Sequence, residues 1–149
     1  MFKQILVPTD GSELSDNTVH KAIAFAKEAG AKLTFFNAMP EPPLSGATLG
    51  DEGKFDPEMP KRFVEAAQKH AWEILNRALE DAKQAGVEAE AALDTSDLPW
   101  QVIIRAAEQR GSDLIFMASH GRRGFNALLM GSETHKVLTH CKLPVLVYR

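Results

Sequence analysis

The sequence is poor in cysteine and has no long apolar run, and both absences limit where the protein can work. Cys141 is the one cysteine among 149 residues, so an intramolecular disulfide is impossible and a reducing compartment is the natural setting. No run approaches the roughly 18 apolar residues of a membrane-spanning helix. The apolar part of residues 1–12 is too short for a signal peptide. We therefore expect a cytoplasmic protein without a membrane partner.

An excess of basic residues is also missing. The 17 Lys and Arg residues are outnumbered by 20 Asp and Glu residues, and the net charge is −3 at pH 7. This balance argues against a nucleic-acid partner bound by bulk electrostatics. The five histidines show no metal-ligand spacing. Hydrophobic residues make up 44% and charged residues 25% of the chain, which is ordinary for a globular protein. We expect a single domain that spans residues 1–149.

Short apolar runs and helical patterns alternate along the chain. The apolar runs predict strands near residues 4–9, 33–38, 87–93, 114–117 and 144–148. Apolar residues at helical spacing predict helices near residues 15–29, 60–85, 98–110 and 133–140. Asp97 is expected to cap the third of these helices. Apolar strands that alternate with helices predict an α/β fold, a single doubly wound parallel sheet with helices on both faces.

The connection between Met39 and Pro60 is long for a compact domain. It is rich in proline, glycine and acidic residues and has no periodicity. Such a segment predicts either a functional flap or a mobile loop. We expect it to be mobile without ligand and to fold over a bound one.

Residues 113–132, DLIFMASHGRRGFNALLMGS, combine a strand, a glycine loop and a helix start. Glycines let the backbone approach a ligand closely, and the N–H groups of a helix's first turn point at an anion. Ser132 suits the N-cap position of the helix. The loop is neither a Walker A nor a G-x-G-x-x-G loop, because neither pattern is present. On spacing alone, a phosphate site and an ordinary strand-to-helix connection are equally supported.

The same segment resembles the nucleotide loop of the universal stress protein family, whose ATP-binding members carry G-x2-G-x9-G-[S/T]. Gly121, nine further residues and Gly131-Ser132 match the second half of this motif, and Ala118 replaces its first glycine. The resemblance extends over nearly the full chain, from the opening ILVPTDGS to the ending GSETHKVLTHCKLPVLVYR. It implies a five-stranded parallel sheet with strand order 3-2-1-4-5.

The resemblance also implies a site for an adenine nucleotide, ATP with or without Mg²⁺. In open parallel sheets, ligands bind beyond the carboxyl ends of the strands, where the strand order reverses. Asp10 would face the ribose or the metal-bound phosphates, although a turn aspartate that bonds its own loop is the alternative. The nucleotide-binding residues implied are Pro8, Thr9, Asp10, Ala38, Met117, Ala118, Ser119, His120, Gly121, Arg122, Gly131, Ser132, Glu133 and Thr134.

No residue is assigned to catalysis. His120 has no carboxylate or cysteine partner nearby in the sequence, so we interpret it as a loop residue rather than a base. Arg122 and Arg123 either neutralise phosphates or form a solvated pair. Phosphoryl transfer also needs an oriented nucleophile, and the sequence shows no clear water-positioning residue. We favour an ATP-binding regulatory stress-response protein. A slow ATPase and a dimeric interaction protein that binds no nucleotide are the alternatives.

The last apolar run begins at Pro144 and ends at Tyr148, and the implied strand order places it at the edge of the sheet. An apolar edge strand offers unpaired backbone groups and side chains to another chain. The only charged residue within reach is Arg149. A two-fold partner can present the same strand from the other side. We therefore expect a homodimer built on Val145, Val147 and their neighbours, as in the dimers of the family that the chain resembles.

Overall fold

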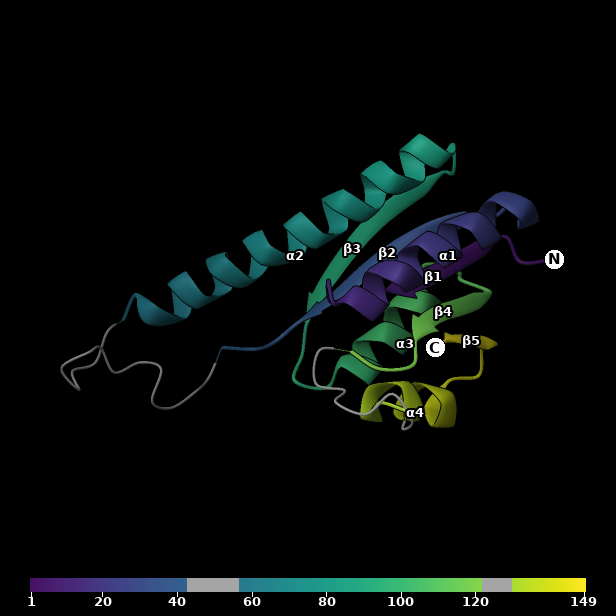
Figure 1. The fold of residues 1–149 in the computed structure, drawn as a ribbon. Helices are drawn as coiled ribbons and strands as arrows, with labels where there is room; N and C mark the ends of the chain where they lie inside the picture. Colours follow the sequence, from purple (N-terminus) through teal and green to yellow (C-terminus); the bar gives the residue numbers. More distant parts are fainter. Residues whose placement is uncertain (43–56, 122–129) are drawn as a thin grey trace.

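The computed structural model describes residues 1–42, 57–121 and 130–149, and Figure 1 shows a parallel sheet with helices on both faces. The elements are β1 (Gln4–Pro8), α1 (Glu13–Ala29), β2 (Lys32–Met39), α2 (Met59–Ala85), β3 (Ala89–Thr95), α3 (Pro99–Gln109), β4 (Leu114–Ala118), α4 (Ser132–His140) and β5 (Val145–Tyr148). The predicted alternation of strands and helices is confirmed. Arg122, Arg123 and most of the connection between Met39 and Pro60 lie outside the described residues.

The five strands are ordered β3-β2-β1-β4-β5, and every pair is parallel. This is the order that the family resemblance implies. β1 lies in the centre, with Gln4 opposite Lys32 of β2 and Ile5 opposite Leu114 of β4. The chain builds outward from β1 through β2 and β3, and then returns to the other side of β1 for β4 and β5. The strand order therefore reverses between β1 and β4.

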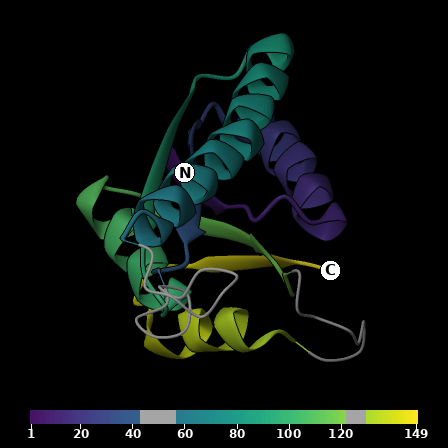
Figure 2. The same ribbon diagram turned by 90° about the vertical axis from the view of Figure 1, so that its left-hand side faces the viewer.

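The sheet separates two apolar cores, which explains why the inner strands are apolar on both faces. Ile5 and Phe35 face α1 and α2, and they belong to the larger cluster of buried residues. Leu6 and Phe36 face α3 and α4 and belong to the second cluster. Figure 2 shows the two helix pairs on opposite sides of the sheet. Each fully buried side chain of this size stabilises the fold by about 1.5–3 kcal/mol.

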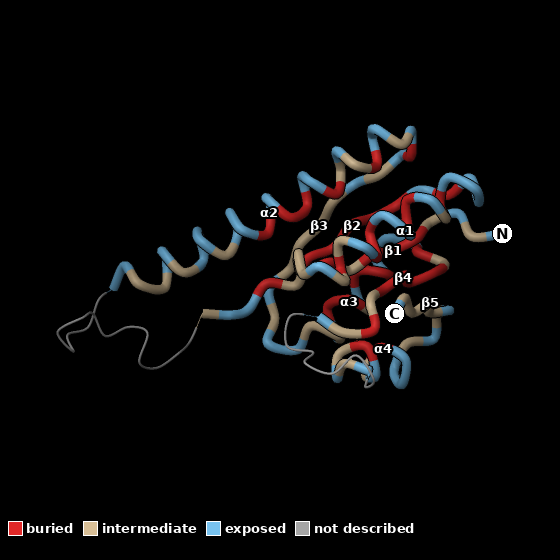
Figure 3. Tube along the Cα trace, in the orientation of Figure 1, coloured by how far each residue is buried: buried red, intermediate tan, exposed pale blue. Residues whose placement is uncertain are grey.

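α2 is longer than the sheet that it covers. Its buried residues begin at Ala71, and Figure 3 shows only exposed and half-buried positions along its amino-terminal turns. These turns extend beyond the body of the fold (Figure 1). Although α2 is long, among the described residues no helix is both long and apolar enough to cross a membrane.

The predicted cap of α3 is wrong by one residue. The N-cap is Leu98, which makes no side-chain cap hydrogen bond, and Pro99 is the first helical residue. A proline fixes its own backbone at the first helical position and keeps the preceding residue out of the helical region. The carboxylate of Asp97 instead accepts a hydrogen bond from the backbone N–H of Glu41, at 3.2 Å.

Ser112 gives a stability prediction. Its side chain is 6% exposed, and its hydroxyl has no hydrogen-bond partner within the described part of the chain. A buried unpaired hydroxyl costs about 1–3 kcal/mol, so Ser112→Ala is expected to raise the free energy of unfolding by up to about 1 kcal/mol. Urea denaturation measures the change.

A second serine provides the matched control. The hydroxyl of Ser15 donates to Thr9 Oγ1 at 2.7 Å and accepts from the backbone N–H of Asp10 at 3.2 Å. Ser15→Ala is therefore expected to lower the free energy of unfolding by about 1–2 kcal/mol. If the two variants lose stability equally, the unpaired hydroxyl of Ser112 is not a cost to the fold.

Candidate functional site

The predicted site residues that the structure describes gather at the carboxyl ends of the central strands. Pro8 ends β1, Ala38 lies near the end of β2, and Ala118 ends β4. Because β1 lies between β2 and β4, the carboxyl ends of these three strands are neighbours. The strand order reverses between β1 and β4, and the carboxyl ends of the strands at such a reversal are the usual ligand position in open parallel sheets.

The loop after β1 is fixed by hydrogen bonds. The backbone N–H of Ser12 donates to Asp10 Oδ1 at 3.0 Å, which is the local turn expected of an aspartate that precedes a helix. Ser12 then caps α1 by accepting from the N–H of Ser15. These contacts point one carboxylate oxygen of Asp10 at its own loop. The bond from Ser12 confirms that Asp10 bonds its own loop.

Thr9 is tied to β2 as well as to α1. Its N–H donates to the carbonyl of Phe36 at 2.9 Å, and its own carbonyl accepts from the side-chain amide of Asn37 at 3.0 Å. Thr9 and Asn37 are 5% and 7% exposed. Asn37 and Ser15, which hold the loop after β1 in place, were not among the residues predicted from the sequence. In the sequence, Asn37 is recognisable as a carboxamide side chain within a mostly apolar predicted strand.

The glycine loop closes on itself at its two described ends. The N–H of Gly131 donates to the carbonyl of Ser119 at 2.7 Å. A Cβ at Gly131 would lie 3.0 Å from the Cα of His120 and 3.2 Å from the Ser119 carbonyl oxygen. Glycine is favoured here, because a side chain would force the two backbone segments apart by a few tenths of an ångström. This contact brings the end of β4 against the start of α4.

Gly121 brings the two loops of the site together. A Cβ at this position would collide with Oδ2 of Asp10. The backbone after β4 therefore lies directly against the carboxylate that follows β1. The two residues are 111 positions apart in the sequence, and only the adjacency of β1 and β4 makes them neighbours. The strand order implied by the family resemblance, in which the first and fourth strands are neighbours, is confirmed at this position.

The start of α4 differs by one residue from the prediction. Gly131, not Ser132, is the N-cap, and Ser132 is the first helical residue. The tight return of Gly131 to Ser119 determines where the helix begins. As in any helix, the N–H groups of the first turn have no intrahelical partner. Among the described residues no side chain caps them, which makes this turn a suitable anion site. Thr134 anchors this turn, because its hydroxyl donates to the carbonyl of Ala118 at 2.9 Å.

Ala118 occupies the position of the missing motif glycine. Within the described residues, only glycines have a positive φ, so the backbone at Ala118 has a conformation open to any residue. Its carbonyl is already engaged by Thr134. The alanine therefore introduces no backbone strain into the loop.

Two other predicted site residues have specific partners. Nδ1 of His120 lies 3.2 Å from the hydroxyl of Ser119, which is a contact inside the loop. The carboxylate of Glu133 accepts a hydrogen bond from the backbone N–H of Trp100, at 2.9 Å. Within residues 1–42, 57–121 and 130–149, no group of three His, Cys, Asp or Glu residues could hold a metal ion.

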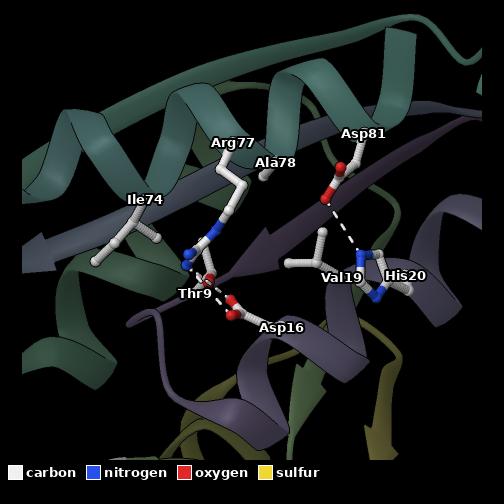
Figure 4. Close-up of a pocket in the computed structure, with 8 residues that line it drawn as sticks. All are labelled: Thr9, Asp16, Val19, His20, Ile74, Arg77, Ala78 and Asp81. Carbon is white, nitrogen blue, oxygen red and sulfur yellow. Dashed lines mark hydrogen bonds and ion pairs between the residues drawn. The ribbon is translucent and has the colours of Figure 1, made fainter. Parts of the chain in front are cut away.

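A pocket also lies between α1 and α2, and Figure 4 shows the side chains that line it. Arg77 pairs with Asp16 and His20 with Asp81, each at 3.2 Å, so both pairs connect the two helices. Such exposed ion pairs typically contribute less than about 1 kcal/mol. Among the described residues, Thr9 is the one predicted site residue that lines this pocket. The pocket is therefore distinct from the junction of Asp10 with Gly121.

Comparison with known proteins reveals full-length relatives. The model of the universal stress protein family matches residues 1–149. The universal stress protein YxiE of Bacillus subtilis is 30% identical over 153 residues, which cover 100% of both chains. A universal stress protein of Thermus aquaticus is 34% identical over 150 residues, again covering 100% of both chains.

Solved structures share the fold. The universal stress protein UspA from Lactobacillus plantarum has a TM-score of 0.83 at 22% identity, covering 99% of this chain and 98% of that one. A universal stress protein in complex with cAMP has a TM-score of 0.69 at 27% identity, covering 99% and 97%. The Archaeoglobus fulgidus protein in complex with dAMP has a TM-score of 0.69 at 18% identity, covering 99% and 98%. Two of these similar structures therefore hold an adenine nucleotide.

Proposed function

The chain belongs to the universal stress protein family, and from this premise we propose that it is a regulatory protein that binds an adenine nucleotide, with ATP as its ligand. The observation that carries the proposal is the contact between Asp10 and Gly121. It brings the loops after β1 and β4 to one point, beside the start of α4. One ligand can then reach all three segments. The cAMP and dAMP complexes of similar proteins support the choice of nucleotide.

The parts of the nucleotide are assigned by chemistry. The phosphates suit the first turn of α4, whose N–H groups and partial positive charge favour anions, and the hydroxyl of Ser132 adds a donor. The ribose lies beside Asp10, whose carboxylate accepts hydrogen bonds from hydroxyls. The adenine edge meets the backbone at Ala38. Asp10 is also the residue that would hold Mg²⁺, which proteins often bind through one carboxylate together with the phosphates.

Nucleotide carried through purification gives the most direct test. We expect native mass spectrometry of the purified protein to detect a bound adenine nucleotide. Titration calorimetry of the stripped protein should then show saturable binding of ATP. An adenine-free triphosphate, such as CTP, is the matched ligand control. A protein that carries no nucleotide and gives no heat with ATP would contradict the proposal and favour an interaction protein that binds no nucleotide.

We expect ATP hydrolysis to be slow or absent, below about 1 per second, the lower end of common turnover numbers. The physical reason is that the two carboxylates among the described residues of the site are engaged by the protein, Asp10 by the N–H of Ser12 and Glu133 by the N–H of Trp100. A steady-state phosphate-release assay measures the turnover. A Gly131→Val sample purified in parallel corrects for contaminating ATPases. A corrected turnover above this limit would identify the protein as an enzyme.

We also propose that the protein is a homodimer that pairs two copies of β5 antiparallel. β5 lies at the edge of the sheet and pairs only with β4 among the described strands. All four of its residues are half-buried. Leu146 and Tyr148 pack on the core under α1 and α2, whereas Val145 contacts the core under α3 and α4. Val147 belongs to neither core cluster, which leaves it for the partner chain.

A further inference from the structure

Glu133 connects the candidate phosphate site to a different helix. It follows Ser132 in the first turn of α4, and its Oε2 accepts the hydrogen bond from the N–H of Trp100 in the first turn of α3. α3 has no side-chain cap of its own. The carboxylate of Glu133 therefore supplies from α4 the cap that Leu98 does not provide. A charged acceptor at a helix amino terminus makes a strong hydrogen bond.

Trp100 contacts α4 at both ends. Its backbone bonds to Glu133 at the start of α4, and its indole ring stacks on the imidazole ring of His140, the last residue of α4. The ring centroids are 4.5 Å apart and the planes are inclined by 26°. Trp100 thus lies along the short helix and fixes its orientation against α3. Thr134 and Gly131 fix the same first turn against the end of β4.

Charge argues that the side chain of Glu133 does not contact the nucleotide. A carboxylate beside a phosphate is repelled, most strongly where water is partly excluded. Two contacts draw the carboxylate of Glu133 elsewhere, the N–H of Trp100 at 2.9 Å and the ammonium of Lys136 at 3.7 Å. The first turn of α4 therefore offers its backbone to a ligand while the side chain of Glu133 is engaged with α3.

We propose that Glu133 and Trp100 are positioning residues for the nucleotide site. Glu133 holds the first turn of α4 in the orientation that receives phosphate, and it acts through Trp100 rather than by touching the ligand. The inference rests on the proposed function, because it assigns a role within the same site. It also links nucleotide binding to α3, since a shift of the α4 turn must move or break the bond to Trp100.

Two substitutions at one position separate positioning from charge. Glu133→Gln removes the charge but keeps an oxygen that accepts from Trp100, whereas Glu133→Ala removes both. We expect the alanine variant to bind ATP about tenfold more weakly, as loss of a charge-assisted hydrogen bond allows. The glutamine variant should bind as tightly as the wild type or more tightly. Equal weakening in both variants would show that the oxygen retained by glutamine does not position the turn, and this would overturn the inference. Equal affinity in all three proteins would overturn it as well.

A second readout does not depend on nucleotide binding. Hydrogen exchange of the amides of Gly131 and His135, which donate to the carbonyls of Ser119 and Gly131, reports the order of the α4 turn. We expect faster exchange in Glu133→Ala than in either Glu133→Gln or the wild type. The matched control is Glu88→Ala, which removes an exposed pair with Lys32 at the amino ends of β2 and β3. This variant should leave the exchange of the α4 turn unchanged. If the wild type binds no nucleotide, the proposed function fails, and exchange that is equal in all variants refutes the positioning role independently.

Discussion

Replacing Gly131 by valine is expected to weaken ATP binding by at least about a hundredfold. The Cβ alone would lie 3.0 Å from the Cα of His120 and 3.2 Å from the carbonyl oxygen of Ser119. These are backbone neighbours, which cannot turn aside as a side chain can. The backbone must therefore shift to make room for the valine, and we expect the bond between Gly131 and Ser119 to weaken and the first turn of α4 to move away from the end of β4. Titration calorimetry with ATP measures the loss.

The control for this variant must separate binding from folding. Valine at an N-cap also costs about 1 kcal/mol of stability, so a variant of similar cost away from the site is needed. Gly111 has a φ of +65° and no neighbour within 4 Å of an added Cβ. Gly111→Ala is expected to lose about 1–2 kcal/mol through backbone strain and to bind ATP normally. A folded Gly131→Val protein with unchanged ATP affinity would remove the proposed site.

Val147→Lys is expected to convert the homodimer into a monomer. In the proposed dimer, Val147 lies where two copies of β5 meet, and an ammonium group buried there without a partner costs several kcal/mol. Lysine on an edge strand is also a device by which natural proteins prevent such pairing. Light scattering at micromolar concentration should give about twice the 16.4 kDa chain mass for the wild type. The variant should give the mass of a single chain.

The same substitution on another surface is the matched control. Val64 lies in the amino-terminal part of α2 and is 37% exposed. Val64→Lys adds the same charge away from β5 and should remain dimeric. A wild-type protein with the mass of one chain, or a Val147→Lys variant that stays dimeric, would defeat the β5 dimer. Dissociation caused by Val64→Lys alone would place the interface on α2.

The fold could be predicted from the sequence because its signals are local. Strands covered on both faces are apolar throughout, and helices that cover one face repeat apolar residues at helical spacing. Both patterns are visible in short windows, so the order of the elements was predictable. Their ends were not. The predicted caps Asp97 and Ser132 are wrong, because Pro99 sets the start of α3 and the return of Gly131 to Ser119 sets the start of α4.

The candidate site was predictable as two segments but not as one arrangement. The acidic loop at Asp10 and the glycine loop at Gly121 are readable because both follow apolar strands and resemble a family motif. Their contact is not readable, since it depends on β4 pairing with β1 after a chain of more than a hundred residues has intervened. The effect of Ala118 also required the structure, because a residue name does not determine φ.

Glu133 shows the limit of local reasoning most clearly. From the sequence it is an acidic residue in the first turn of a helix, next to a serine in a phosphate motif, and it was predicted to bind nucleotide. The sequence pattern was enough to predict a helix after the glycine loop. Only the tertiary structure decided where the carboxylate goes, because its partner, the N–H of Trp100, belongs to another helix. That N–H lies within reach of Glu133 because α3 and α4 pack on the same face of the sheet. This packing depends on residues far apart in the sequence, so it cannot be inferred from sequence neighbours.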